Sequence, residues 1–234
     1  MRLSRVVLKR GSQLAVLQGM IHIGPDKLYE LLQGDVDWAT RNNYQIFFEG
    51  VKKDPPKRAS TANESKIKKF FLFLFDLYPV FAAVLGISLQ KEKIAYPQSA
   101  INADITFVEF IKQLDNNGFR CNFLLQLFSF LGKKELKKKF EDEFIKRGGF
   151  NALMNSHERW SFSKLVAWFL FRKAMPIILD YRNKVAVAKV RAHCGGRNIF
   201  IHYGEKHIKG LVNLLRQDGW VVKETTHTDL AEFC

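Results

Sequence analysis

The chain has 234 residues, 47% of them hydrophobic, which is enough for one large domain with a sizeable core and argues against a wholly disordered chain. Its formal net charge of +14 predicts attraction to an acidic partner, whether lipid, nucleic acid or protein. The 3 cysteines are far apart and form no Cys-x-x-Cys pair, which argues against a disulfide framework or a cysteine zinc site and favours a reducing compartment.

The N-terminal region is predicted to form a β-hairpin. Val6–Lys9 and Leu14–Gln18 are short β-prone runs, separated by the turn-like sequence Arg-Gly-Ser-Gln. Basic residues surround only a short apolar stretch in Met1–Gly11, which lacks the apolar core and cleavage site of a signal peptide. We therefore expect a cytoplasmic protein, with membrane association left open.

A helix and a strand are predicted next. Pro25 stands at a plausible first helical position, the leucines that follow recur at helical spacing, and Gly34 is predicted to end the helix. Tyr44–Phe48 is then typical of a buried strand, which ends at Glu49. From Lys52 to Ala62 the composition changes to Lys, Pro, Ser and Thr, which predicts a surface loop.

Residues 65–171 are rich in phenylalanine and predict an α-helical insert or cap. Within it, residues 70–89 are apolar over a length that would cross a bilayer, but Asp76 and Pro79 interrupt them. A buried or membrane-surface helix pair is the favoured interpretation. The lysine-rich run at residues 133–139 is followed by three acidic residues, which favours a solvated helix face over a nucleic-acid patch.

The last quarter alternates again between strand and helix patterns. After a short apolar run at Pro176–Leu179, the predicted elements are a helix at Asn183–Arg191, a strand at Asn198–Tyr203, a helix at Ile208–Arg216 and a strand at Trp220–Lys223. The predicted fold is therefore α/β, with a mixed central sheet, strand–GxxH–helix units from both chain ends and an α-helical insert. The core domain would comprise residues 1–64 and 172–234, interrupted by the insert at residues 65–171.

Two Gly-x-x-His sequences and one glutamate are candidates for chemistry. His22 and His207 follow apolar strands and precede helices, and Glu49 ends a strand. Ligands of open α/β sheets bind beyond the carboxyl ends of strands, so these side chains are expected at one edge. Glycine in each turn would permit positive φ and turn the imidazole back over the strand end. Two imidazoles and a carboxylate form a common first shell for zinc, manganese or iron(II).

The sequence resembles the TraB/GumN family, which includes the Tiki metalloproteases and the pheromone-shutdown proteins. The resemblance lies in the segments QGMIHIG, IFFEG, INADITFVEF, LDYRN and HYGEKHIKGLVNLL. It implies that His22, Glu49 and His207 are metal or catalytic residues, that Arg182 and Asn183 match the family's polar pair, and that Asp104 matches its mid-chain aspartate. Met20 departs from the family's pattern, which usually has threonine after the first glycine.

Each of the matched polar residues has an expected role. Arg182 would neutralise an oxyanion or a substrate carboxylate, with an ordinary salt bridge as the alternative, and Asn183 would orient a histidine or water. Asp104 ranks low, because Thr106 with Glu109 fits a helix-capping arrangement better. Glu205 is a candidate general base, although a solvated surface charge is the simpler interpretation.

The leading functional hypothesis is a divalent-metal-dependent hydrolase of peptide or amide bonds, acting on a peptide or protein substrate. The alternative is a non-catalytic peptide-binding or immunity-type protein that acts at an anionic membrane surface through Phe-rich basic helices. Nucleic-acid binding is disfavoured, because it rests on charge alone and no nucleic-acid-binding motif is apparent. The sequence leaves the oligomeric state open.

Overall fold

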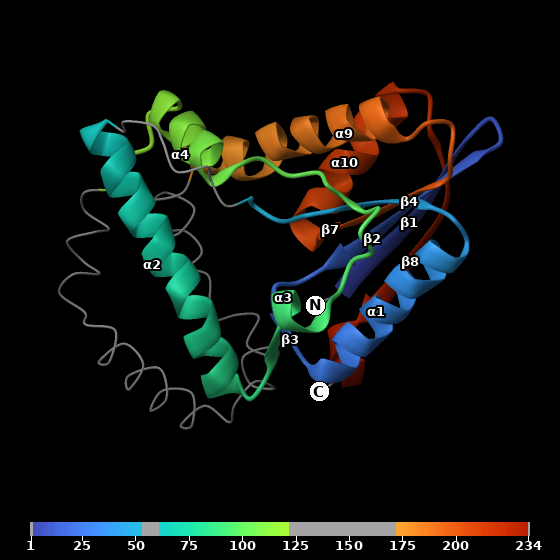
Figure 1. Cartoon of the computed structure of the whole chain (residues 1–234), viewed down its shortest axis with the longest axis horizontal. Coiled ribbons are helices and arrows are strands. Elements are labelled where there is room, and N and C mark those ends of the chain that lie inside the picture. Colours follow the sequence, from blue (N-terminus) through green and yellow to red (C-terminus); the bar gives the residue numbers. More distant parts are fainter. Residues whose placement is uncertain (1, 53–60, 122–171, 234) are drawn as a thin grey trace.

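The N-terminal hairpin is confirmed in the computed structural model, which describes residues 2–52, 61–121 and 172–233 (Figure 1). Strands β1 (Arg2–Arg10) and β2 (Gln13–Met20) pair antiparallel, and Gly11 takes a positive φ of 58° in the turn between them. Strand β8 (Val221–Asp229) pairs antiparallel with the other side of β1 and is longer than the strand predicted there. The two chain ends thus meet in one sheet.

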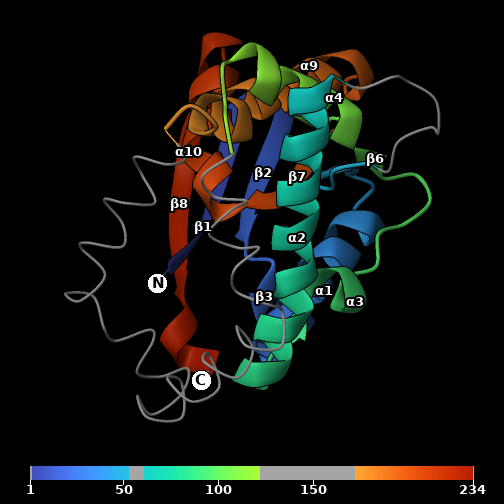
Figure 2. The same cartoon turned by 90° about the vertical axis from the view of Figure 1, so that its left-hand side faces the viewer.

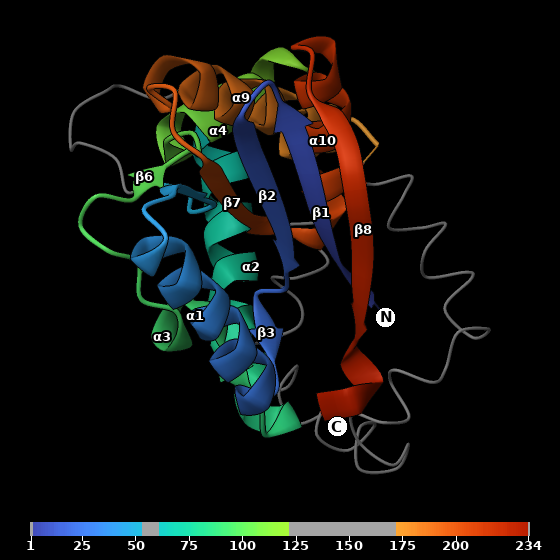
Figure 3. The same cartoon turned by 90° about the vertical axis from the view of Figure 1, so that its right-hand side faces the viewer.

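Three further strands extend the sheet on the other side of β2. They are β7 (Ile199–Gly204), β4 (Gln45–Phe48) and β6 (Ile101–Asn102), and each runs parallel to its neighbour. The complete order is β6-β4-β7-β2-β1-β8, and Figure 3 shows β7, β2, β1 and β8 side by side. The predictions of an α/β fold with a mixed sheet and of strands near β4 and β7 are confirmed. Because β2, β7, β4 and β6 are parallel, their carboxyl ends share one edge.

Helices cover both faces of this sheet (Figure 1). On one face, α1 (Asp26–Arg41) packs its buried residues, such as Leu28 and Leu32, against Val16 and Phe200. On the other face lie α9 (Arg182–His193) and α10 (Glu205–Gln217). The prediction that α1 ends at Gly34 is wrong: the helix continues through it, since burial of Val36 and Ala39 against the sheet outweighs one glycine.

Helix α2 (Ala62–Leu85) is one continuous helix, so the predicted helix pair is wrong. Thr61 caps its start in a reciprocal capping box with Glu64, Pro79 lies inside it, and Gly86 ends it with a positive φ of 63°. In the described part of the chain, no helix is both long enough and apolar enough to cross a membrane. Figure 2 shows α2 standing alongside the sheet edge with α4 (Phe107–Asn116) at its upper end.

A third apolar cluster joins α2, α4 and a π-helical turn, η1 (Pro176–Tyr181), which leads directly into α9. Phe70, Phe71 and Phe110 meet in it, with ring centroids of Phe71 and Phe110 4.9 Å apart. The phenylalanine-rich sequence of α2 is therefore used in part for a buried core.

Short elements connect α2 to the sheet. Strand β5 (Ser88–Leu89) pairs with β3 (Ile23–Gly24), α3 (Gln90–Lys93) follows, and a 3-10 turn, η2 (Leu230–Phe233), lies at the end of the chain. Strands β5 and β6 fall within residues 65–171, for which only helices were expected. The predictions for residues 53–60 and 122–171, including the lysine-rich run, lie outside the described residues.

Candidate functional site

Four parallel strands each deliver one polar residue just beyond their carboxyl ends. His22 follows β2, Glu49 follows β4, Asp104 follows β6, and His207 lies three residues after the last residue of β7. The registers align Met20 with Gly204 and Phe48 with both His202 and Asn102. The structure thus brings the predicted residues His22, Glu49 and His207 together at one sheet edge.

Glu49 lies at the centre of this group and is buried. Its Oε1 accepts a hydrogen bond from Arg182 Nη2 at 2.5 Å, and its Oε2 accepts one from the backbone N–H of Gly204 at 2.6 Å. Burial alone would raise the pKa of the carboxyl group, but Arg182, the charges that the two imidazoles carry when protonated and the Gly204 N–H outweigh it and lower this pKa to about 2. Glu49 is therefore ionised at neutral pH.

Both histidines turn Nε2 toward the same carboxylate oxygen. The distance to Glu49 Oε1 is 3.8 Å from His22 and 3.7 Å from His207. These separations are too long for hydrogen bonds, whereas two donors at tetrahedral positions around one zinc ion lie about 3.4 Å apart. No group of three His, Cys, Asp or Glu side chains within residues 2–52, 61–121 and 172–233 already has the arrangement of a metal site.

His207 is buried in the first turn of α10, so it lies within the helix that follows the glycine. Its Nδ1 lies 2.7 Å from Asn183 Oδ1. Burial lowers the pKa of His207 to about 4, against the opposing effect of Glu49, so the ring is neutral at pH 7. Because Asn183 Oδ1 can only accept, Nδ1 carries the proton and the lone pair of Nε2 faces Glu49. The expected orienting role of Asn183 matches this contact.

His22 occupies a more open position, with its side chain 49% exposed. Its Nδ1 lies 3.0 Å from Gln90 Oε1, and the edge of its ring meets Tyr78 of α2 at a centroid distance of 6.1 Å. Burial and the charge of Glu49 raise the pKa of Tyr78. The two imidazoles are therefore held alike, each by a side-chain amide oxygen at Nδ1, although one is buried and the other is accessible.

Arg182 is buried between two carboxylates. Besides Glu49, it binds Asp104 through Nε at 2.9 Å and Nη2 at 2.6 Å. Asp104 is almost wholly buried, and Lys189 Nζ donates to its backbone carbonyl. Asp104, ranked low from the sequence, thus lies in direct contact with Arg182. The helix cap is indeed Thr106, whose side chain accepts from the N–H of Glu109 at 3.1 Å, which leaves the Asp104 carboxylate for the arginine.

The glycines of both Gly-x-x-His sequences are explained by close approach, and the expectation of positive φ is wrong. Gly19 lies within β2, and Gly204 has a φ of −53°. A Cβ at position 204 would lie 2.8 Å from Glu49 Oε2, and one at position 19 would collide with the carboxylate of Glu205. Each glycine therefore leaves room for a carboxylate that bonds to nearby backbone.

Glu205 itself is bound to Ser4 of β1. Its Oε2 accepts from the backbone N–H of Ser4 at 2.7 Å and its Oε1 from the Ser4 hydroxyl at 2.6 Å. The carboxylate is therefore not a freely solvated charge, and its candidate role as a general base stays a prediction. It ties the start of α10 to β1.

Several residues near the site were not anticipated: Tyr78, Gln90, Tyr96 and His202. Gln90 and Tyr96 lie in the segment between α2 and β6, where the sequence has no motif to identify them. His202 does carry a signal, because a histidine inside an otherwise apolar strand is unusual. Its side chain is fully buried on the α1 face of the sheet, and burial lowers its pKa to about 4.

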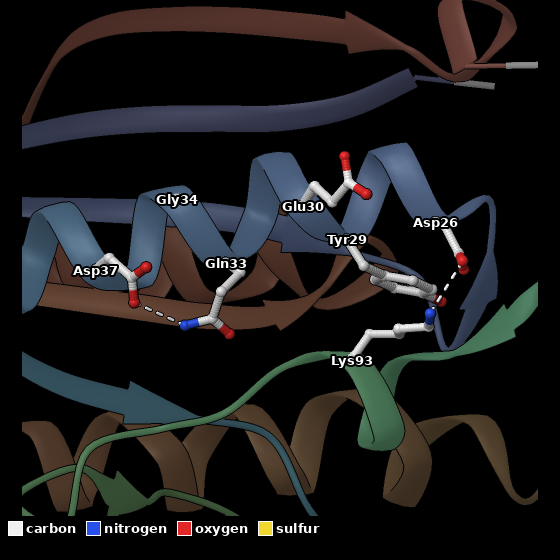
Figure 4. A pocket seen from close by; sticks show the side chains of 7 residues that line it. All are labelled: Asp26, Tyr29, Glu30, Gln33, Gly34, Asp37 and Lys93. Atoms are coloured by element: carbon white, nitrogen blue, oxygen red, sulfur yellow. Dashed lines mark hydrogen bonds and ion pairs between the residues drawn. The ribbon is translucent and has the colours of Figure 1, made fainter.

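A separate surface pocket lies along α1 and does not include these residues (Figure 4). Asp26 forms an ion pair with Lys93 at 2.9 Å there, and Gln33 donates to Asp37 at 2.7 Å. Two of its acidic side chains, Asp26 and Asp37, thus already bind neighbouring residues. The candidate residues His22, Glu49 and His207 lie at the strand ends instead.

Comparison of the chain with models of known protein families, with curated proteins and with solved structures gave no match.

Proposed function

We propose that this protein is a divalent-metal-dependent hydrolase of peptide or amide bonds, with His22, His207 and Glu49 as the metal ligands. The supporting observation is that the Nε2 atoms of both imidazoles face one oxygen of an ionised carboxylate, at 3.8 and 3.7 Å. Arg182 already donates to this oxygen, but neither imidazole Nε2 lies within hydrogen-bond distance of it, and a shared cation would join all three groups. The choice of peptide or amide bonds rests on the resemblance to the TraB/GumN proteins.

Each side chain has a defined task in this proposal. His207 is neutral and presents its Nε2 lone pair, because Asn183 holds the proton on Nδ1. Glu49 contributes negative charge, and Arg182 fixes its position. His22 is the adjustable ligand, because its side chain is half exposed and lies between two strands, so it can shift to complete the set. A divalent ion at such a site supplies Lewis acidity that activates water toward an acyl carbon.

The roles of Arg182 and Asn183 are revised in this proposal. Arg182 already binds Glu49 and Asp104, so we assign it to holding the carboxylate rather than to binding an oxyanion. Asn183 orients His207, the role proposed for it from its match to the family's polar pair.

Metal titration tests the ligand set. Metal-free protein would be titrated with Zn²⁺ and with Mn²⁺ by calorimetry, together with His22→Ala, His207→Ala and the control His193→Ala, which removes an exposed histidine of α9. Loss of a ligand should weaken binding more than the roughly 10- to 100-fold effect of losing an outer-shell partner. Unchanged affinity in both site variants would rule out this ligand set. Cleavage of a quenched-fluorescence peptide mixture by the metal-loaded protein then tests the reaction.

A second candidate is a non-catalytic peptide-binding or immunity-type protein that acts at a membrane surface. Two observations favour it: Arg182 already neutralises Glu49, and α2 exposes Leu72 and Phe75 by 44% and 39%. Flotation with phosphatidylserine vesicles at low salt separates the candidates. Binding to the vesicles without metal affinity or peptide cleavage would support the second candidate, whereas metal affinity without vesicle binding would support the first.

A further inference from the structure

A row of hydrogen bonds connects His22 to the interior of the sheet. Gln90 contacts His22 twice, because its backbone N–H donates to the His22 carbonyl at 2.9 Å and its Oε1 lies 3.0 Å from Nδ1 of the ring. The side-chain amide of Gln90 donates to the hydroxyl of Tyr96 at 3.5 Å. The same hydroxyl lies 2.9 Å from Nδ1 of His202. Four side chains are thus joined from the half-exposed ring to a fully buried one.

The direction of each hydrogen bond in this row can be assigned. Since Gln90 donates to the Tyr96 oxygen, the hydroxyl hydrogen is left for Nδ1 of His202. Tyr96 keeps that hydrogen at neutral pH, because burial raises its pKa. The remaining amide atom of Gln90 is Oε1, which can only accept, so Nδ1 of His22 must be the donor. Nδ1 of His22 therefore carries a hydrogen, and in the neutral ring the Nε2 lone pair faces Glu49.

The only side-chain hydrogen bond of His202 in the part of the chain that the structure describes is the one with Tyr96. Nε2 of His202 is buried and has no hydrogen-bond partner among the described residues, and because Nδ1 accepts from Tyr96, Nε2 carries the proton of the neutral ring. An unpaired buried N–H is unfavourable, and an aromatic hydrocarbon would fill the space beside Phe200 without that penalty. What the histidine supplies is an acceptor that fixes the hydroxyl of Tyr96, whose ring also stacks on Phe48 at 4.1 Å.

We propose that Gln90 is a positioning residue that sets the tautomer of His22, and that Tyr96 and His202 hold the Gln90 amide in the required orientation. An imidazole in water favours the proton on Nε2, so an acceptor at Nδ1 is needed to reverse this preference. Reversal leaves Nε2 free to bind a cation. This inference rests on the proposed function, because an Nε2 lone pair on His22 matters only if His22 binds a metal ion. The tautomer itself is independent of hydrolysis.

Nitrogen NMR of histidine-labelled, metal-free protein at pH 8 tests this inference. In the wild type, Nδ1 of His22 should have the shift of a protonated nitrogen and Nε2 that of an unprotonated one. Gln90→Leu should move His22 to the Nε2–H form, while Gln90→Glu, which restores an acceptor, should return it to the Nδ1–H form. Tyr96→Phe removes only the hydroxyl that orients Gln90 and should produce a mixture. Gln217→Leu, at an exposed position of α10, serves as the control.

The outcomes separate this inference from the proposed function. An Nε2–H form of His22 in the wild type, or a tautomer that Gln90→Leu leaves unchanged, would overturn the inference. If Gln90→Leu does not fold, Tyr96→Phe and Gln90→Glu replace it, because both closely preserve side-chain volume. A mixture of tautomers in Tyr96→Phe and the Nδ1–H form in Gln90→Glu would support the inference, and the same tautomer in both would overturn it. Zn²⁺ affinity should fall about 10- to 100-fold in Gln90→Leu and recover in Gln90→Glu. Expected tautomers without Zn²⁺ affinity in the wild type would contradict the proposed function while supporting the inference.

Discussion

Glu49 and Gly204 form a contact that excludes any side chain at position 204. The N–H of Gly204 donates to Glu49 Oε2 at 2.6 Å, and a Cβ on the same residue would lie only 2.8 Å from that oxygen. The hydrogen bond closes the end of β4 against the end of β7 and the start of α10. Position 204, the glycine of the second Gly-x-x-His sequence, therefore requires glycine because the Glu49 carboxylate lies too close for a Cβ.

Gly204→Ala should therefore destabilise the protein by about 1–3 kcal/mol, the range for forcing an added carbon into a packed site. The matched control is Gly34→Ala, where an added Cβ meets nothing within 4 Å in the interior of α1. This change should stabilise the protein by about 0.5–1 kcal/mol through helix propensity. Urea denaturation at pH 7.5 measures both. Equal effects of the two substitutions would contradict the contact.

A second glycine makes room for the residue that orients His207. A Cβ at Gly210 would collide with Nδ2 of Asn183, whose Oδ1 holds Nδ1 of the imidazole. Gly210→Ala should cost about 1–3 kcal/mol in the wild type. In an Asn183→Ala background the obstacle is absent, so the same substitution should become neutral or stabilising through helix propensity. A double-mutant cycle by urea denaturation gives the coupling, and additive effects would show that the two residues do not compete for space.

The sequence predicts the sheet edge well because its signals are local. Apolar runs before Gly19, Glu49 and Gly204 identify strands, and parallel strands bring their carboxyl ends together without further information. The position of Asp104 was missed because β6 is only two residues long, too short for a periodic signal. Gln90 was missed because its place depends on the path of α2 and on the pairing of β5 with β3, which are tertiary effects.

Arg182 compensates two buried carboxylates, so its removal should be severe. Arg182→Met should lower the free energy of unfolding by about 3–5 kcal/mol, since Glu49 and Asp104 would be left without their counter-charge. Adding Asp104→Asn should recover part of this loss by removing one orphaned charge. Arg191→Met breaks an ion pair with Asp218 in which the arginine side chain is 54% exposed, and should change stability little. A lower free energy of unfolding in the Arg182→Met/Asp104→Asn double variant than in Arg182→Met alone would contradict this account.

The two buried histidines of β7 and α10 predict a loss of stability in mild acid. Burial lowers the pKa of His202 and of His207 from the ordinary 6.5 to about 4. Below pH 6.5 the unfolded chain binds protons that the folded chain does not accept until about pH 4, so stability falls as the pH is lowered through this window. For metal-free protein the loss should reach about 2 kcal/mol per histidine at pH 5 relative to pH 8.

His202→Phe removes one of the two titrating rings and fills its space with an apolar one. The variant should lose about half of the pH dependence between pH 6.5 and 4, whereas His193→Ala, at an exposed position, should keep all of it. The lowered pKa of Glu49 acts mainly below its ordinary value of 4.5 and down to about 2, and it is common to the wild type and both variants, so it cancels in this comparison. Urea denaturation at half-unit steps from pH 4 to 8 measures the effect. A His202→Phe profile parallel to that of the wild type would mean that His202 takes up its proton as readily in the folded protein as in the unfolded chain. Tyr96 could then not be donating to its Nδ1.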